Sequence, residues 1–182
     1  MPLGFLQHSY KPGFLFAGRR INLDWNATAA TLLAAERQMS VANKVLIYRW
    51  YEEVWNKQNE RVLDEMLSAE VVLYGLADSP TEFLKGPEQF KKYWRAMLSV
   101  FPDVRIAVES TIAEDEKVVA RCSLRATHQG DGLGFPATQQ KVHITGVTIA
   151  VFKEGKVVEA WNNFDYLTVY RQLGAFPRQV QS

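Results

Sequence analysis

The sequence has little cysteine, little net charge and no long apolar run. Its 182 residues include one cysteine, Cys122, which excludes an internal disulfide and the cysteine spacing of a zinc finger. The 21 basic and 20 acidic residues give a net charge of +1, so nothing favours a nucleic acid or an anionic membrane as a partner. No stretch approaches the ~20 apolar residues that a membrane span needs. We therefore expect a cytoplasmic protein without a nucleic-acid or membrane partner.

Aromatic residues, by contrast, are plentiful. They make up 12% of the chain and include five tryptophans, and apolar residues make up 47%. Aromatic side chains bring large apolar areas, so a big core or a lined cavity is expected. The length suits one domain with some additional chain.

The additional chain is expected at the N-terminus. Residues 1–38 mix glycine, proline, aromatic and basic residues without a lasting period, and Asp24 is the first acidic residue. This composition has some likeness to an organelle transit peptide. The segment is either a dispensable extension or an arm that packs on a partner subunit. We expect the domain itself over residues 39–176, followed by a tail at 177–182.

Apolar periodicity predicts helices in the first half of the domain. Val41–Asn56 has apolar residues at helical spacing, with Ser40 as a possible cap. Glu60–Leu67 reads as a second, short helix. A third begins at Gly86, has proline in its first turn, and carries an aromatic face. A final short helix is predicted over Tyr166–Leu173.

The second half is predicted to be mainly strand. Glu154-Gly155 separates the last two strands and has the length that a tight hairpin turn prefers. Helices followed by such strands indicate an α+β fold. The predicted strands are Glu70–Leu76, Val104–Ala113, Lys117–Gln129, Val142–Phe152 and Val157–Phe164.

These features together resemble the SnoaL-like polyketide cyclase (ester cyclase) family, within the nuclear transport factor 2-like fold. The likeness runs from about Val45 to Gly174. The resemblance implies a cone in which a bent antiparallel sheet is wrapped by three helices around a cavity. It also implies a homo-oligomer, commonly a dimer. The matching stretches are YRWYEEVWNKQN, GPEQFKKYW followed by FPD, THQGDGLGFPAT, and EGKVVEAWNNFDYLTVYRQLG.

The family resemblance implies an intramolecular aldol-type ring closure without metal or cofactor. In the family an aspartate on the last strand moves the proton, and a histidine on the preceding strand holds the substrate carbonyl. Counted from the Glu-Gly-Lys turn, these positions fall on Asn162 and Thr148, and a further polar position falls on Gly146. A carboxamide donates and accepts hydrogen bonds but does not exchange protons near neutral pH. The fold is therefore expected to transfer, while the acid–base chemistry is not.

Two further residues are candidates for the missing base. Asp165 is the nearest carboxylate to Asn162, although an aspartate before a helical run also suits a cap. His128 ends a long strand beside a glycine-rich loop that reads as a lid, and a lone histidine there is as well explained by a structural role. No ligand spacing for a metal is visible around His128 or His143.

Aromatic residues on the first strand and the third helix are candidate ligand contacts. Tyr74, Trp94 and Phe101 are predicted to face either the cavity or the core, which their spacing alone does not separate. Together with Gly146 and His128 they form the predicted ligand-binding set. The predicted catalytic set is Asn162, Thr148 and Asp165.

Three functions remain open from the sequence. The first is a cofactor-free cyclase or isomerase acting on a hydrophobic carbonyl compound, with Asn162 and Thr148 polarising the carbonyl. The second is a module that binds a hydrophobic small molecule without catalysis. The third is an assembly domain whose cavity is filled by side chains. Small or polar residues at the inward hairpin positions favour the first two.

Overall fold

The computed structural model describes residues 14–16, 19–21, 25–77 and 82–175. The chain separates into two compact units, Met1–Arg37 and Gln38–Ser182. In the first unit, β1 (Phe14–Phe16) and β2 (Arg19–Ile21) form an antiparallel pair. The rest of that unit before residue 25, the tail at 177–182 and the loop around residue 80 lie outside the described residues.

One long helix leads into the second unit. Helix α1 (Trp25–Arg49) continues directly into a π-helix, η1 (Trp50–Asn56). The predicted cap at Ser40 is therefore wrong, because Ser40 lies within the helix. No proline or glycine interrupts residues 25–56, and the alanine-rich stretch before Ser40 has high helix propensity. The π-helical turns make i→i−5 hydrogen bonds, as in Lys57 N–H to the Glu52 carbonyl.

Three more helices follow close to the predicted positions. They are α2 (Arg61–Met66), α3 (Gly86–Val100) and α4 (Tyr166–Gln172). The described part of the chain thus has four α-helices and one π-helix, which cover the three helices predicted around the sheet and the predicted final helix. None of the described helices has both the length and the hydropathy required to cross a membrane.

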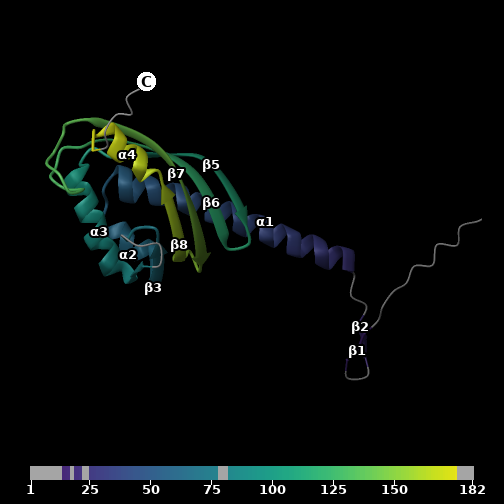
Figure 1. The fold of residues 1–182 in the computed structure, drawn as a ribbon. Helices are drawn as coiled ribbons and strands as arrows, with labels where there is room; N and C mark the ends of the chain where they lie inside the picture. Colours follow the sequence, from purple (N-terminus) through teal and green to yellow (C-terminus); the bar gives the residue numbers. More distant parts are fainter. Residues whose placement is uncertain (1–13, 17–18, 22–24, 78–81, 176–182) are drawn as a thin grey trace, which may run out of the picture. The chain divides into compact units, whose positions relative to one another are not determined.

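The second unit contains a strongly curved six-stranded sheet (Figure 1). The strand order is β4-β3-β8-β7-β6-β5, and β5 to β8 are joined as antiparallel neighbours. The strands are β3 (Leu67–Tyr74), β4 (Phe83–Lys85), β5 (Arg105–Glu114), β6 (Lys117–Thr127), β7 (Lys141–Lys153) and β8 (Lys156–Phe164).

The predicted antiparallel sheet is in fact mixed. Strand β3 pairs with β8 in parallel, with Tyr74 opposite Trp161. The sequence missed this because alternation reveals strands but not the partners of strands that are far apart in the chain. Unlike hairpin neighbours, β3 and β8 are connected through several intervening elements, so their direction is not fixed by a short turn.

The predicted hairpin turn between β7 and β8 is confirmed. Lys153 pairs with Lys156, and the two residues between them have positive φ angles, 50° at Glu154 and 76° at Gly155. Two consecutive positive φ angles define the type I′ turn that matches the twist of a tight hairpin. The turn sets the first pairs of β7 and β8, and a register shift between Val151 and Phe152 moves the remaining pairs by one residue.

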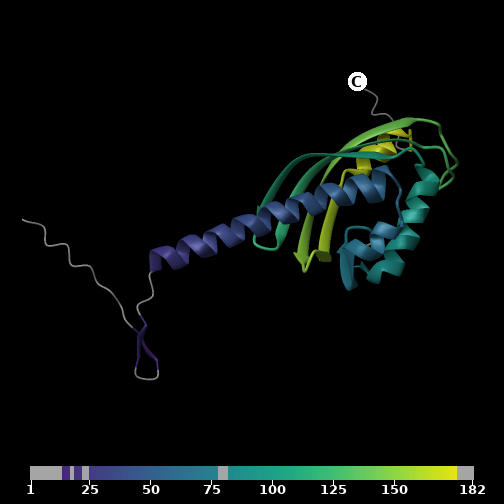
Figure 2. The same ribbon diagram turned by 180° about the vertical axis from the view of Figure 1, so that it is seen from behind.

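The core lies between the concave side of the sheet and the helices. Burial alternates along β7, with Val142, Ile144, Gly146 and Thr148 buried on one face. From behind, residues of the second unit in α1 and η1 cross in front of the strands (Figure 2). Val54 of η1 is fully buried, so this helical segment supplies one wall of the core.

Candidate functional site

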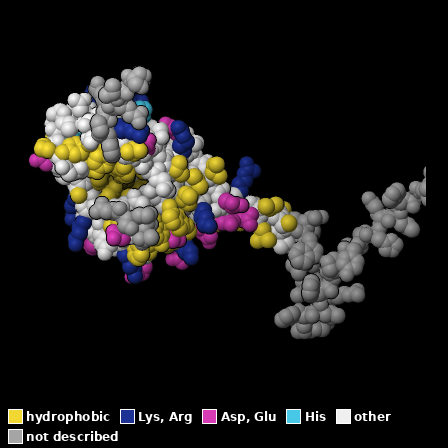
Figure 3. Space-filling view, in the orientation of Figure 1, with side chains coloured by type: hydrophobic (Ala, Val, Ile, Leu, Met, Phe, Trp, Pro, Cys, Tyr) yellow, Lys and Arg dark blue, Asp and Glu magenta, His cyan; other side chains and the backbone are white. Residues whose placement is uncertain are grey.

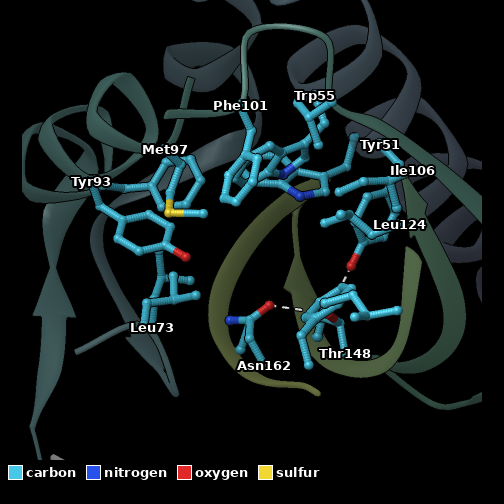
Figure 4. Close-up of a pocket in the computed structure, with 18 of the residues that line it drawn as sticks. Tyr51, Trp55, Leu73, Tyr93, Met97, Phe101, Ile106, Leu124, Thr148 and Asn162 are labelled. Atoms are coloured by element: carbon cyan, nitrogen blue, oxygen red, sulfur yellow. Dashed lines mark hydrogen bonds between the residues drawn. The ribbon is translucent and has the colours of Figure 1, made fainter. Parts of the chain in front are cut away.

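A cavity of about 60 Å³ opens between the sheet and the helices (Figure 4). The space-filling view shows a hollow in this face with hydrophobic side chains gathered in it (Figure 3). At roughly 10–15 Å³ per water, the cavity has room for a few waters. Most of its walls are aliphatic, and eight aromatic residues complete them: Trp50, Tyr51, Trp55, Phe90, Tyr93, Phe101, Phe164 and Tyr166.

A chain of hydrogen bonds crosses the floor of this cavity. The Tyr51 hydroxyl donates to Thr148 Oγ1 at 2.7 Å, and the Thr148 hydroxyl donates to Asn162 Oδ1 at 3.0 Å. Asn162 Nδ2 then donates to the backbone carbonyl of Tyr74 at 3.1 Å. Thr148 and Asn162 are direct partners in the β7–β8 register, which is why their side chains meet.

Burial keeps the Tyr51 hydroxyl, the first donor of this hydrogen-bond chain, in its protonated form. Burial raises the pKa of the Tyr51 hydroxyl well above its ordinary value, and the neighbouring Cys122 thiol raises it further. Tyr51 therefore stays protonated at neutral pH and acts as a donor. The Cys122 pKa is also raised by burial, so this thiol is not an activated nucleophile.

A second polar spot lies across the cavity. The hydroxyls of Tyr93 on α3 and Tyr166 on α4 are 3.0 Å apart. Burial raises the pKa of Tyr93 well above its ordinary value, and Tyr166 adds to this effect. Burial likewise raises the pKa of Tyr166. Both hydroxyls are therefore neutral, and the pair ties the two helices together at the cavity wall.

The described residues that line the cavity include no acidic or basic side chain. Among its described lining residues there is no carboxylate, histidine, lysine or arginine. The described residues also contain no group of three or more histidine, cysteine, aspartate or glutamate side chains suited to a metal ion. The polar chemistry available here is hydrogen bonding by neutral groups.

Three of the predicted site residues line this cavity. They are Asn162, Thr148 and Phe101. Tyr74 reaches the site through its backbone carbonyl, while its ring stacks on Trp161 at 5.5 Å. Trp94 lies in the core, where its indole N–H donates to the Val54 carbonyl at 3.2 Å. The sequence left these two rings open between the cavity and the core, because a regular aromatic spacing does not reveal which face a strand or helix buries.

Gly146 lies under an aromatic ring. A Cβ atom built at this position would stand 2.4 Å from the Phe164 ring and 2.9 Å from the Asn163 carbonyl oxygen. The ring of Phe164, which lines the cavity, therefore occupies the space of any side chain at residue 146. This packing accounts for the absence of a polar residue at that position.

Asp165 caps a helix. Its carboxylate accepts hydrogen bonds from the Thr168 N–H at 3.0 Å and the Thr168 hydroxyl at 2.6 Å, at the start of α4. It is not among the lining residues of the cavity. The structural alternative that the sequence offered for Asp165 therefore describes its observed hydrogen bonds. Asp165 and Asn162 both line a second pocket, but both hydrogen bonds of the Asp165 carboxylate given above come from Thr168.

His128 is completely buried at the end of β6 but does not line the cavity. Its Nδ1 accepts a hydrogen bond from the Thr138 N–H at 3.1 Å, which closes the base of the glycine-rich loop. Rings of Phe101 and Phe135 pack against it at 5.7 Å and 5.3 Å. These contacts give His128 a role in holding the loop.

Sequence reasoning missed three tyrosines of the site. Tyr51 was recognised as part of an apolar helical stripe, and Tyr93 as part of an aromatic helix face, but neither was assigned a polar role. Tyr166 was read as the start of a helix. The hydroxyl of a tyrosine in a buried stripe needs a partner, and that requirement was the available signal.

Comparisons with known proteins agree with this geometry. The family model for the SnoaL-like polyketide cyclase matches residues 45–173. The chain belongs to this family. No curated protein sequence gives a significant match. The family model leaves out residues 1–44, which include the whole first unit.

Several solved structures share the fold. AclR of Streptomyces galilaeus, a proposed hydroxylase, has 28% identity and a TM-score of 0.67 over 76% of this chain and 99% of its own. IdmH of Streptomyces antibioticus, a proposed polyketide cyclase, has 26% identity and a TM-score of 0.65 over 72% and 98%. A SnoaL-like protein from Jannaschia sp. CCS1 has 24% identity and a TM-score of 0.68 over 76% and 96%. The predicted α+β cone is confirmed.

The packing of Phe164 over Gly146 predicts a stability effect. Gly146→Ala forces its new methyl group against the ring, so we expect a loss of about 1–3 kcal/mol in the free energy of unfolding, measured by chemical denaturation. In a Phe164→Ala background the same change should cost much less. Equal costs in the two backgrounds would show that the ring is not what excludes a side chain at residue 146.

The Asp165 cap predicts a pH effect on stability. Hydrogen bonds from Thr168 hold the Asp165 pKa below its ordinary value of 3.8. A carboxyl with a lowered folded-state pKa contributes stability that is present above the unfolded pKa and is lost as pH falls through the folded pKa. Asp165→Asn, which retains a cap, should flatten this part of the acid side of the stability profile, whereas Asp165→Ala should lower the melting temperature at neutral pH. An unchanged melting temperature in the alanine variant would contradict the capping role.

Proposed function

We propose that this protein holds a hydrophobic small molecule in the cavity and contacts it by hydrogen bonding rather than by proton transfer. One observation carries the proposal. Where the family has a catalytic aspartate, this chain has Asn162, and its carboxamide is held between Thr148 and the Tyr74 carbonyl. The apolar walls would bind the body of the ligand.

The neutral state of the polar groups supports binding without acid–base catalysis. A general base needs a pKa near the working pH, and a carboxamide has none there. The tyrosines of the cavity have raised pKa values because they are buried, which moves them further from that condition. Asp165 is occupied as a helix cap, and His128 does not line the cavity.

The size of the cavity sets a condition on any ligand. At about 60 Å³ it is much smaller than the roughly 300–1,000 Å³ of typical small-molecule pockets. A ligand larger than a few waters must therefore displace a wall side chain. Met97 is half-buried in the wall, and an unbranched thioether repacks readily. A cavity that stays closed would instead leave the third function, an assembly domain.

Binding is tested with a small apolar probe. We expect acetophenone to perturb the NMR methyl signals of lining residues such as Leu73, Ile106 and Leu124. Ile112 on the outer side of the domain is 72% exposed and serves as the internal control. Ala160→Leu, which fills the cavity, should abolish the perturbations. Perturbations confined to outer residues, or none at all, would refute a ligand cavity.

Family membership favours a second function, cofactor-free cyclisation or isomerisation of a hydrophobic carbonyl compound. IdmH, which is 26% identical, is a proposed polyketide cyclase. Here the amide of Asn162 would polarise the carbonyl, as an oxyanion-hole donor does. AclR, at 28% identity, is a proposed hydroxylase, so similarity at this level does not select one reaction.

Restoring the family's carboxylate tests this second function. We expect Asn162→Asp to introduce or raise ring-closing activity on linear polyketide esters, assayed by product formation. The Tyr74 carbonyl would face the new carboxyl and favour its protonated form, so the rate should rise with pH. Asn162→Leu is the matched inactive control. No gain over a panel of esters would count against an inherited cyclase role.

We also propose that the protein is a homodimer through the outer face of its sheet. Registered neighbours place one apolar residue on this face in each of the six strands, and such a continuous apolar patch is typical of an interaction surface. Phe83 and Ile112, at the two ends, are 48% and 72% exposed. The row is Ile112, Val119, Ile149, Trp161, Tyr74 and Phe83.

Charge in this row should separate the subunits. We expect Ile112→Lys combined with Phe83→Lys to convert the dimer to a monomer in sedimentation experiments, because buried lysines would lose their hydration. Leu167→Lys, at a residue that is 49% exposed outside the row, is the control and should leave the mass unchanged. A wild-type monomer, or a dimer that survives both lysines, would refute the proposed interface.

A further inference from the structure

We propose that Asn162 offers one amide N–H to the ligand while Thr148 acts as a positioning residue, so that the cavity selects compounds with a hydrogen-bond acceptor such as a carbonyl. This inference rests on the proposed binding function and narrows it to a ligand class. It also changes the role expected for Thr148, which sequence reasoning treated as a direct contact.

The direction of the hydrogen-bond chain follows from its backbone end. The Tyr74 carbonyl can only accept, so the Asn162 atom 3.1 Å from it must be the amide nitrogen. The amide oxygen then faces Thr148, and this oxygen can only accept. Thr148 must therefore use its one hydroxyl proton on Asn162 Oδ1, at 3.0 Å. Tyr51 completes the chain by donating to Thr148 Oγ1 at 2.7 Å.

This arrangement leaves Thr148 with no proton for a ligand. Thr148 is 3% exposed, its hydroxyl proton is committed to Asn162, and its oxygen already accepts from Tyr51. The side chain therefore acts through Asn162, whose amide it holds in one orientation.

Asn162 retains a donor. Its amide nitrogen carries two protons, and the Tyr74 carbonyl accepts one of them. Figure 4 shows the amide nitrogen turned away from Thr148, on the side of the cavity where the Tyr93 hydroxyl also lies. Since Asn162 lines the cavity, the second N–H is the group that meets a ligand there.

A donor fixed in an apolar cavity discriminates between ligands of the same shape. A carbonyl oxygen accepts the N–H, whereas an alkene of equal size leaves it without a partner in the complex. The difference for a single buried hydrogen bond corresponds to about tenfold in affinity.

The test compares acetophenone with α-methylstyrene, in which a CH₂ group replaces the carbonyl oxygen. Dissociation constants for both are measured by NMR titration on the full chain and three variants. Relative to Asn162→Leu, the wild type should favour the ketone by about tenfold more. Thr148→Val should lose most of this preference, and Thr148→Ser, which keeps the hydroxyl, should retain it.

The outcomes separate the two proposals. If both probes bind in the cavity and the ketone preference is the same in wild type and Asn162→Leu, the inference is wrong and the binding function stands. If neither probe binds, the binding function fails and the inference falls with it. If Thr148→Ser loses the preference as fully as Thr148→Val, Thr148 does not position the amide through its hydroxyl.

A spectroscopic measurement covers the case in which a variant does not fold. The infrared C=O stretch of ¹³C-labelled acetophenone bound to the wild type should lie at lower wavenumber than in an alkane solvent, because the N–H polarises the carbonyl. A stretch equal to the alkane value in the bound state would overturn the inference without any substitution.

Discussion

The contact between the Tyr74 carbonyl and the Asn162 amide is the constraint on which the site depends. It exists because β3 and β8 run parallel, which brings the end of β3 against the middle of β8. The approach is close, since a Cβ atom at Gly75 would stand 2.0 Å from the Asn162 carbonyl oxygen. A glycine with φ of 73° at that position lets the strand end there and leave the Tyr74 carbonyl free to accept.

The same contact explains why an amide is stable at residue 162. An ionised carboxylate would place negative charge against an acceptor oxygen in a largely apolar cavity, which is unfavourable. An amide matches both neighbours, since it donates to the Tyr74 carbonyl and accepts from Thr148. A protonated carboxyl would match them as well. The local structure thus favours a side chain at residue 162 that donates a hydrogen bond to the Tyr74 carbonyl of β3. An ionised carboxylate that served as a general base at this position could not donate this hydrogen bond and is therefore disfavoured.

The sequence contains the local part of this site but not the long-range part. The type I′ turn at Glu154-Gly155 was predictable, but counting straight from it would pair Thr148 with Trp161. A register shift between Val151 and Phe152 moves the pairing by one residue and places Thr148 opposite Asn162. The inward face of β7 also followed from alternation. The parallel pairing with β3 and the approach of Tyr51 over 97 residues of chain leave no periodic signal. The sequence therefore offered Tyr74 only as a ring that faces the cavity or the core, whereas its backbone carbonyl is the group that reaches Asn162.

The π-helix completes the constraint from the other side of the cavity. The widened turns of η1 carry Trp50, Tyr51 and Trp55, all of which line the cavity. π-helical turns are uncommon, costly and frequent at functional sites. Here the turns place a protonated tyrosine at the start of the hydrogen-bond chain and two large rings beside it.

The same helix, η1, therefore supplies both the first hydrogen-bond donor of the cavity floor and the rings that narrow the cavity. Moving η1 to enlarge the cavity would also break the hydrogen bond from the Tyr51 hydroxyl to Thr148. A ligand is better admitted through the opposite wall, at Met97 and the Tyr93–Tyr166 pair. Side chains there can move while the hydrogen bonds that link the Tyr51 hydroxyl to the Tyr74 carbonyl stay intact.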